Sequence, residues 1–271
     1  MVAMTVAGSD SGGGAGIEAD LRTFAALGVH GTAAITAVTA QNTHEVRAVC
    51  ALEAEMVRCQ IETVTDDLNL TATKTGMLAR PATVLEVAVL AQTGRFGALV
   101  VDPVLVTSTG HPLMESGGTD AYRTALLPHA AIVTPNLYEA AVLADCDVRE
   151  LRTIDAMTDA ARTILSFGPQ YVFVKGGHFV SDSVTAAASP DVLVGASTTV
   201  VLDAPRITTP NDHGTGCSLA AAITARVARG DDIETAVRFA KQFVSRALVG
   251  AAEWRLGKGH GPIDHMGWSV P

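Results

Sequence analysis

Apolar positions along the chain follow two alternating patterns. Short apolar runs predict buried strands, and stretches whose apolar residues recur every three to four positions predict amphipathic helices. Strands are expected at residues 2–8, 32–42, 46–51, 72–78, 97–105, 130–136 and 171–177. Helices are expected at about 17–28, 53–67, 81–92, 117–127, 136–144, 155–167, 215–229 and 232–249.

This alternation predicts a three-layer α/β/α protein, with a mostly parallel central sheet flanked by helices on both faces. Residues 181–205 differ, because short Val- and Thr-rich segments separated by Gly and Ser indicate a small β-hairpin flap. No linker, low-complexity tract or internal repeat interrupts the pattern, so we expect a single domain over residues 1–271. Ligands of such sheets bind beyond the carboxyl ends of the strands.

The composition agrees with a large buried core. Of the 271 residues, 48% are apolar and only 17% are charged, so disorder is not expected. A formal net charge of −9 argues against nucleic-acid binding. We expect neither a signal peptide nor a transmembrane helix, because the start lacks a basic and then apolar segment and no run of about 18 apolar residues occurs. Four separated cysteines without a CxxC motif favour a reducing, cytoplasmic location over a zinc site or disulfides.

Polar residues and glycines gather directly after the predicted strands. They occupy positions 8–10, 41–42, 76–77, 102–104, 134–136 and 175–177. The Gly-rich run AGSDSGGGAG at 7–16 raises the question of a phosphate-binding loop, but the chain has no GxxxxGK[ST] motif. Because the carboxyl ends of parallel strands share one edge of the sheet, these residues together predict a ligand site there.

The segment HGTGC at 213–217 is the most informative, because a helical pattern follows it directly. Gly214, Thr215, Gly216 and Cys217 therefore lie at a helix N-terminus, where unpaired N–H groups and the helix dipole favour an anion. The site suits a transferring phosphoryl group, although a Gly-containing helix start with only a packing role is the alternative. The same position could lower the pKa of the Cys217 thiol and make it a base or nucleophile, unless Cys217 is simply a small buried residue.

Three further positions suggest phosphate or metal chemistry. Lys175 could reach nucleotide phosphates, or it is an ordinary lysine at a strand end. Asp102 could bind Mg²⁺ directly or through water. Asn136 and Glu139 begin a helix, where a glutamate in the first turn also has a purely structural explanation. Ser218 lies in GCSLA, which departs from the GxSxG elbow of serine hydrolases at Ala220 and leaves a hydrolase only as a remote alternative.

Seven ordered motifs resemble those of hydroxymethylpyrimidine kinases, which also act as phosphomethylpyrimidine kinases of thiamine biosynthesis. They are GSDSGGGAGIEADLRTFAALGVHG, AVTAQNT, KTGML, VVDPV, TPNLYEA, VKGGH and HGTGC. With GKGHGP at 257–262, the similarity covers nearly the whole chain. The resemblance implies a ribokinase-like fold and the use of ATP and Mg²⁺ in two successive phosphorylations of a small pyrimidine. A monovalent-cation requirement is left open, and we expect a homodimer that binds neither nucleic acid nor membrane.

The resemblance also implies roles for individual residues. Residues 214–217 would form the anion hole, with Cys217 in the place of a catalytic base. Gln41 would read the ring nitrogen and amino group of the pyrimidine, since an amide can donate and accept at once. The other implied substrate-pocket residues are Gly8, Asp20, Met77 and Val104. The implied nucleotide-binding residues are Lys175, Asn136 and Lys258, and Asp102 with Glu139 would be the acidic pair near Mg²⁺.

Three residues depart from the family pattern, in which Gln, Lys and Thr are usual. They are Glu18, Arg22 and Asp212, of which Asp212 would repel a triphosphate unless it faces away or helps with Mg²⁺. Two alternative functions stay open beside the hydrolase. One is pyridoxal kinase activity, alone or in addition, against which Gln41 argues if it is the sole activity. The other is a non-catalytic pyrimidine-binding or regulatory protein on the same fold.

Overall fold

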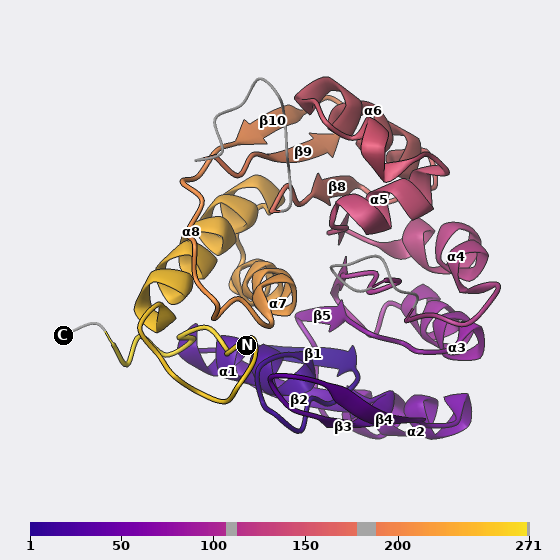
Figure 1. Cartoon of the computed structure of the whole chain (residues 1–271). Coiled ribbons are helices and arrows are strands. Elements are labelled where there is room, and N and C mark those ends of the chain that lie inside the picture. Colours follow the sequence, from indigo (N-terminus) through magenta and orange to yellow (C-terminus); the bar gives the residue numbers. More distant parts are fainter. Residues whose placement is uncertain (107–112, 178–187, 270–271) are drawn as a thin grey trace.

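A computed structural model describes residues 1–106, 113–177 and 188–269. Its central sheet has the strand order β10-β9-β8-β7-β6-β5-β1-β2 (Figure 1). The strands are β1 (Val2–Ala7), β2 (His30–Ile35), β5 (Ala72–Thr75), β6 (Ala98–Val101), β7 (Ile132–Val133), β8 (Tyr171–Val174), β9 (Asp191–Gly195) and β10 (Thr199–Leu202). All neighbours are parallel except β9, which is antiparallel to both β8 and β10.

Helices cover both faces of this sheet, as the alternation of elements predicts (Figure 1). One face packs against α1 (Gly16–Ala26), α7 (Thr215–Ala228) and α8 (Ile233–Ala251). The other face packs against α2 (Ala54–Thr65), α3 (Pro81–Gln92), α4 (Gly118–Ala121), α5 (Leu137–Ala144) and α6 (Ile154–Leu165). The three-layer α/β/α fold is therefore confirmed.

The strands are apolar on both faces because each face has its own core. In β8, Val172 and Val174 pack into the core under α5 and α6, whereas Phe173 points into the core under α7 and α8. Side chains of a strand alternate between the two faces, so a strand buried on both sides reads as a continuous apolar run. This explains why the predicted strands were visible as unbroken runs.

The predicted strand at 32–42 is in fact two strands in two different sheets. β2 ends at Ile35, and β3 (Ala37–Gln41) pairs with β4 (Val46–Ala51) in a separate antiparallel hairpin. Thr36 marks the break: it is buried, its N–H donates to Ala7 and its hydroxyl donates to the Met77 carbonyl at 2.5 Å. The apolar pattern runs through this bend, so the sequence alone did not reveal it.

Two other elements differ from expectation in detail. The predicted helix at 117–127 is α4 followed by a π-helical turn, η1 (Tyr122–Leu126), and a 3₁₀ turn, η2 (Leu127–His129), because Pro128 has no N–H with which to continue an α-helix. The hairpin predicted within 181–205 is present as β9–β10, but it extends the edge of the main sheet. The first part of that predicted flap lies outside the described residues. A last short 3₁₀ turn, η3 (Val148–Glu150), follows α5. Among the helices of the described residues, none is long and apolar enough to cross a membrane.

Candidate active site

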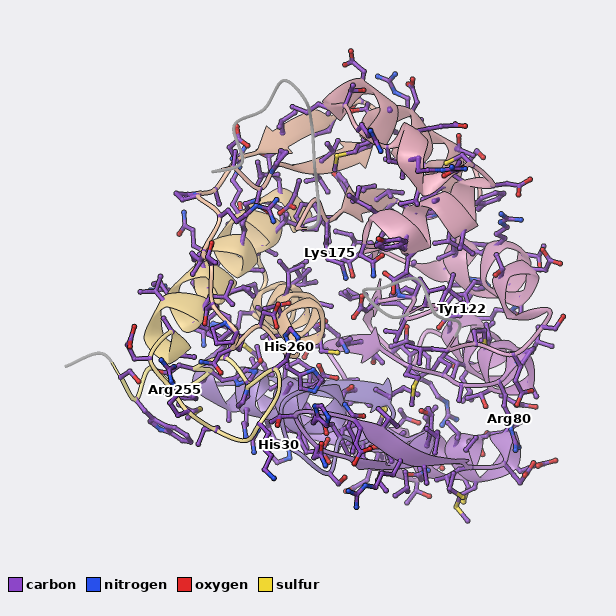
Figure 2. The ribbon with its side chains drawn as sticks, viewed as in Figure 1. His30, Arg80, Tyr122, Lys175, Arg255 and His260 are labelled. Atoms are coloured by element: carbon purple, nitrogen blue, oxygen red, sulfur yellow. The ribbon has the colours of Figure 1, made fainter. Side chains whose placement is uncertain are left out.

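The carboxyl ends of β6, β7 and β8 bring a charged cluster together. Lys175 follows β8, and its Nζ lies 2.8 Å from Oδ1 of Asp102, which follows β6. The hydroxyl of Thr134, after β7, donates to the same carboxylate oxygen at 3.3 Å. Figure 2 shows Lys175 in the middle of the molecule, between α7 and α5. The structure thus joins two of the predicted site residues directly.

Glu139 and Asn136 form a reciprocal cap at the start of α5. The backbone N–H of Glu139 donates to Oδ1 of Asn136 at 2.9 Å, and the N–H of Asn136 donates to Oε2 of Glu139 at 2.8 Å. Burial raises the pKa of Glu139 to about 7, helped by the carboxylate of Asp102 and opposed by the charge of Lys175. Burial alone would lower the pKa of Lys175, but Asp102 and Glu139 raise it, so the lysine stays charged. Glu139 therefore stabilises the start of α5, as its structural explanation predicted, and it also belongs to the charged cluster.

This cluster fits Mg²⁺ in the chemistry of its donors. Within the described residues, no group of three or more His, Cys, Asp and Glu side chains is arranged to hold a metal ion. Mg²⁺ does not need such a cage, because it keeps several waters and is usually held by one or two carboxylates together with substrate phosphates. Asp102 and Glu139 supply two such carboxylates near the N-terminus of α7.

The HGTGC segment lies at a helix N-terminus, as predicted. Gly214 is the residue before α7 and has a φ of +83°. A Cβ at this position would overlap the carbonyl oxygen of Gly14, so only glycine allows the approach. The residues from Gly214 to Cys217 are partly exposed, and no side chain caps the helix. The N–H of Thr215 donates to the carbonyl of Asp212 at 3.4 Å, and no side chain accepts from the N–H groups of Gly216 and Cys217. A Cβ on Gly216 would lie 3.3 Å from Nζ of Lys175, so the lysine stands beside the same N-terminus.

The thiol of Cys217 does not have the lowered pKa that its place on the helix suggested. Burial raises its pKa to about 11; the positive charge of Lys74 works in the other direction, and the carboxylates of Asp20 and Asp102 add to the rise. The expectation of a reactive thiolate was therefore wrong for the protein without ligands. Burial and the charges of Asp20 and Asp102 therefore outweigh the helix dipole.

The opening Gly-rich loop packs against both β3 and the HGTGC segment. Ser9 and Ser11 bind the backbone of β3, with Ser11 Oγ accepting from the N–H of Gln41 at 2.8 Å. Nε2 of His213 lies 2.8 Å from Oδ2 of Asp10 and 3.3 Å from Nε2 of Gln41. The predicted pyrimidine-reading residue is thereby placed next to the loop that carries the anion site.

Two more of the predicted substrate residues, Gly8 and Met77, meet beside Ala37 of β3. Gly8 is buried under Met77, and a Cβ on Gly8 would overlap the end of that side chain. Met77 and Val104 are partly exposed. Val104 has a φ of +36°, which is rare for a β-branched residue. Backbone strain of this kind is concentrated at functional sites, so it supports the prediction that Val104 belongs to one.

Asp20 has a different environment from the other predicted substrate residues. It is fully buried, and its Oδ2 accepts from the hydroxyl of Thr5 at 2.6 Å and from Nζ of Lys74 at 2.9 Å. Lys74 is also fully buried, on β5. The charge of Lys74 acts on Cys217, so this ion pair lies underneath the anion site.

Lys258 lies on the C-terminal tail, where its backbone N–H donates to the Thr43 hydroxyl at 3.2 Å, beside the β3–β4 turn. The structure does not place it with the Lys175 and Asp102 cluster by any contact among the described residues. Its assignment to the nucleotide stays a prediction.

The departures from the family pattern all have partners. Oδ1 of Asp212 lies 2.7 Å from Nδ1 of His260, so its carboxylate is engaged with the tail. Glu18 Oε2 accepts from the N–H of Asp10 at 2.7 Å. Arg22 donates to the carbonyl of Gly13. Glu18 and Arg22 therefore shape the opening loop.

Sequence reasoning did not assign roles to four residues that the structure brings into the site: Asp10, Lys74, His213 and His265. Asp10 and His213 stood inside the quoted motifs, and Lys74 begins KTGML. His265 carried no such signal, although it lies 2.7 Å from Ser218. Their partners are 47 to 203 residues away along the chain, so only the folded structure reveals them.

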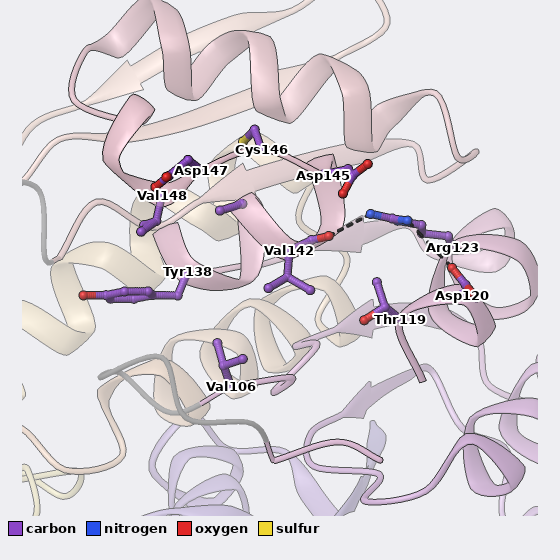
Figure 3. A pocket seen from close by; sticks show the side chains of 11 residues that line it. Val106, Thr119, Asp120, Arg123, Tyr138, Val142, Asp145, Cys146, Asp147 and Val148 are labelled. Carbon is purple, nitrogen blue, oxygen red and sulfur yellow. Dashed lines mark hydrogen bonds and ion pairs between the residues drawn. The ribbon is translucent and has the colours of Figure 1, made fainter. Parts of the chain in front are cut away.

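A surface cavity of about 570 Å³ lies elsewhere, between α4, α5 and η3 (Figure 3). Its lining includes Tyr138, Arg123, Asp145 and Asp147, and none of the predicted site residues. Arg123 donates to the carbonyls of Val142 and Leu143, so its positive charge stabilises the C-terminal end of α5. The chemistry of the strand edge is thus not centred in this cavity.

The fold and site together define a small-molecule kinase of the ribokinase-like class. The structure aligns with a pyridoxal kinase of Bacillus subtilis in complex with ADP, with a TM-score of 0.88, 35% identity and coverage of 99% of this chain and 98% of that one. It also aligns with a phosphomethylpyrimidine kinase of Clostridium difficile, with a TM-score of 0.79, 36% identity and coverage of 92% and 99%.

The sequence comparisons identify the family. The model of the phosphomethylpyrimidine kinase family matches residues 10–264. A hydroxymethylpyrimidine/phosphomethylpyrimidine kinase of Streptomyces coelicolor is 45% identical over 98% of this chain and 94% of its own. A thiamine biosynthetic bifunctional enzyme of Arabidopsis thaliana is 43% identical over 97% of this chain and 49% of its own. The chain belongs to the phosphomethylpyrimidine kinase family.

Proposed function

We propose that this chain transfers the γ-phosphoryl group of ATP to the hydroxymethyl oxygen of 4-amino-5-hydroxymethyl-2-methylpyrimidine. In a second reaction it phosphorylates the resulting monophosphate to the diphosphate, in thiamine biosynthesis. The arrangement around α7 carries the proposal: an uncapped helix N-terminus, Lys175 beside Gly216, and Gln41 next to the same loop through His213. Family membership and the kinase names of the relatives support it.

Each group has a defined task in this reaction. The N–H groups of residues 214–217 stabilise the charge on the transferring phosphoryl group, and Lys175 adds a positive charge on the same side. Asp102 and Glu139 would hold Mg²⁺, which neutralises phosphate charge when it is bound. Gln41 orients the aminopyrimidine edge. Cys217, which is protonated at neutral pH, contacts the substrate hydroxyl as a thiol, since phosphoryl transfer depends mainly on positioning and charge stabilisation.

The direct test is ATP consumption with the hydroxymethylpyrimidine and, separately, with its monophosphate. Turnover of both at saturating Mg-ATP is the expected result. The absence of turnover with either substrate would contradict the proposal. Pyrimidine binding that Mg-ATP does not affect, without product, would favour the non-catalytic alternative.

Pyridoxal kinase activity is the second candidate. The structural similarity to pyridoxal kinases favours it as an additional activity. A parallel assay with pyridoxal compares the two, and we expect the higher kcat/KM for the pyrimidine because Gln41 complements its two neighbouring polar groups. A much higher kcat/KM for pyridoxal would reverse this order.

The oligomeric state is part of the same proposal. We infer a homodimer in which each copy acts as one kinase domain over residues 1–271. Light scattering after gel filtration measures it, and a mass near twice 28.0 kDa is expected. A mass near 28.0 kDa at assay concentration would contradict it.

A further inference from the structure

A buried histidine on the C-terminal tail reaches the helix that carries the anion site. Nε2 of His265 lies 2.7 Å from Oγ of Ser218, 47 residues away along the chain. The same Oγ donates to the carbonyl oxygen of Gly214 at 2.8 Å. His265 is only 5% exposed and Ser218 is fully buried. Three groups are therefore joined from the tail to the residue that precedes α7.

The ring of His265 is neutral at neutral pH. Burial, with the positive charge of Arg22, lowers its pKa to about 4, whereas Asp264 and a hydrogen bond to the backbone of Ile263 work in the other direction. A neutral ring carries one N–H, and the tautomer decides whether Nε2 donates to Oγ of Ser218 or accepts its proton. Either tautomer gives one hydrogen bond between the two side chains.

A serine next to a histidine could also suggest hydrolysis, but this pair is not built for it. Ser218 lies inside α7, after the Gly214 turn, and is closed off from solvent. Its Oγ is hydrogen-bonded inside the fold to both the Gly214 carbonyl and the His265 ring, so no nucleophilic oxygen is presented to a substrate. The pair is structural support, and the hydrolase alternative has no basis in this geometry.

His265 reaches the N-terminus of α7 through Ser218. No side chain caps α7, a feature that it shares with α1, α2 and α3. The N–H of Thr215 donates to the carbonyl of Asp212 at 3.4 Å, and no side-chain cap fixes the direction of the next N–H groups, those of Gly216 and Cys217. The tail supplies contacts from the outside, since the N–H of His213 also donates to the carbonyl of Gly261 at 3.1 Å.

We propose that His265 is a positioning residue, which acts through Ser218 to hold Gly214 and the first N–H groups of α7 in the direction that phosphoryl transfer requires. The kinetic part of this inference rests on the proposed function, because that function assigns the phosphoryl group to these N–H groups. A displacement of catalytic groups by about 1 Å can cost a hundredfold in rate, so loss of this support should act on kcat.

The kinetic test compares His265→Phe and His265→Gln with the wild-type chain. We expect His265→Phe to lower kcat about tenfold or more, with the KM for the hydroxymethylpyrimidine changed less than about twofold. His265→Gln keeps an amide that can donate to Ser218 or accept from it, and should recover most of the loss. His30→Gln is the matched control, because His30 is exposed at the start of β2. An unchanged kcat in folded His265→Phe, or a rise in KM alone, would overturn the proposal.

A second variant and a second measurement keep the inference independent of folding and of the substrate. Ser218→Ala removes the link from the other side and should cost a similar factor in kcat, with little further loss in the double variant. Hydrogen exchange of peptides covering 211–219 should be faster in His265→Phe and Ser218→Ala, and unchanged in His30→Gln. Unchanged hydrogen exchange in both variants would refute the positioning role, whether or not the wild-type chain phosphorylates the pyrimidine. Absence of pyrimidine turnover by the wild-type chain would refute only the proposed function.

Discussion

Asp10 and His213 meet at 2.8 Å although 203 residues separate them along the chain. The contact joins the opening Gly-rich loop to the HGTGC segment, for which an anion site is proposed. The Asp10 carboxylate also accepts from the N–H groups of Gly12, Gly14 and Ala15. A single buried carboxylate therefore shapes the first loop and ties it to the second. The opening loop has the glycines expected of a phosphate loop, but its backbone donors are already satisfied by Asp10.

The first prediction concerns the stability that Asp10 contributes. Burial alone would raise its pKa, but hydrogen bonds from His213 and the loop backbone lower it below the ordinary value of 3.8. A lowered carboxyl pKa contributes stability above 3.8, and this contribution is lost as the pH falls through the folded pKa. We expect Asp10→Ala to lower the free energy of unfolding by about 1–3 kcal/mol at pH 7, because loop N–H groups lose their acceptor.

Urea unfolding of Asp10→Ala and wild type between pH 3 and pH 7 measures this effect. The difference between the two should shrink toward the acid end, where the wild-type carboxylate takes up its proton. A difference that stays constant over the whole range would show that the carboxylate charge is not involved.

The second prediction tests Gln41. Removing its amide in Gln41→Ala leaves polar atoms of the bound pyrimidine without partners, which costs about 1–3 kcal/mol of binding free energy. The Kd for the pyrimidine should therefore rise about fivefold to a hundredfold, while the Kd for ATP stays within about twofold. Titration calorimetry with each ligand measures both, and Gln92→Ala, at the exposed end of α3, is the control. Equal losses for both ligands would contradict the assigned role.

Much of the fold follows from local patterns in the sequence. Helices such as α7 and α8 are predictable because their apolar residues recur over three turns or more and clear start and stop residues bound them. The passage from β2 to β3 was missed because the bend at Thr36 depends on hydrogen bonds to Ala7, at the end of β1, and to Met77, in the loop after β5. Periodicity reports burial, and both sides of the bend are partly buried.

The candidate site was predictable to a different degree. Asp102 and Lys175 were expected at one edge because the carboxyl ends of parallel strands meet there, and their ion pair confirms that placement. The pKa of Cys217 was not predictable, since it depends on the enclosure of the sulfur and on Asp20 and Asp102 across the fold. Sequence motifs identified the loops that form the candidate site. The electrostatic interactions between residues of different loops depend on how the folded chain packs, so the motifs did not reveal them.

The third prediction follows from the raised pKa of Cys217. With a pKa of about 11, roughly one thiol in ten thousand is ionised at pH 7, and the thiolate is the form that reacts. We expect iodoacetamide to label Cys217 much more slowly than the exposed Cys50 and Cys59, with a rate that still rises above pH 9. Mass spectrometry of the separate peptides measures all three in one sample. Preferential labelling of Cys217 at pH 7 would instead indicate that the helix N-terminus dominates.

The last prediction concerns the buried pair of Asp20 and Lys74, which was not foreseen when Asp20 was assigned to the substrate pocket. Burial alone would lower the pKa of Lys74, but the carboxylate of Asp20 raises it, whereas burial raises the pKa of Asp20 against the opposing charge of Lys74. Asp20→Asn leaves the ammonium group buried without its partner, and we expect a loss of about 3–5 kcal/mol in the free energy of unfolding. Lys74→Met should cost a similar amount, and the double variant should cost clearly less than the sum.

Denaturant unfolding of the three variants measures this coupling, and Glu62→Gln is the control because its ion pair with Arg58 is exposed on α2. The control should change the free energy of unfolding by less than about 0.5 kcal/mol. The pyrimidine Kd of the folded Asp20→Asn protein then separates the two roles. If stability is unchanged and the Kd rises as it does for Gln41→Ala, Asp20 contacts the substrate. If stability falls and the single losses are not additive, Asp20 acts by holding the charge of Lys74 beneath Cys217, and its effect on the pyrimidine is indirect.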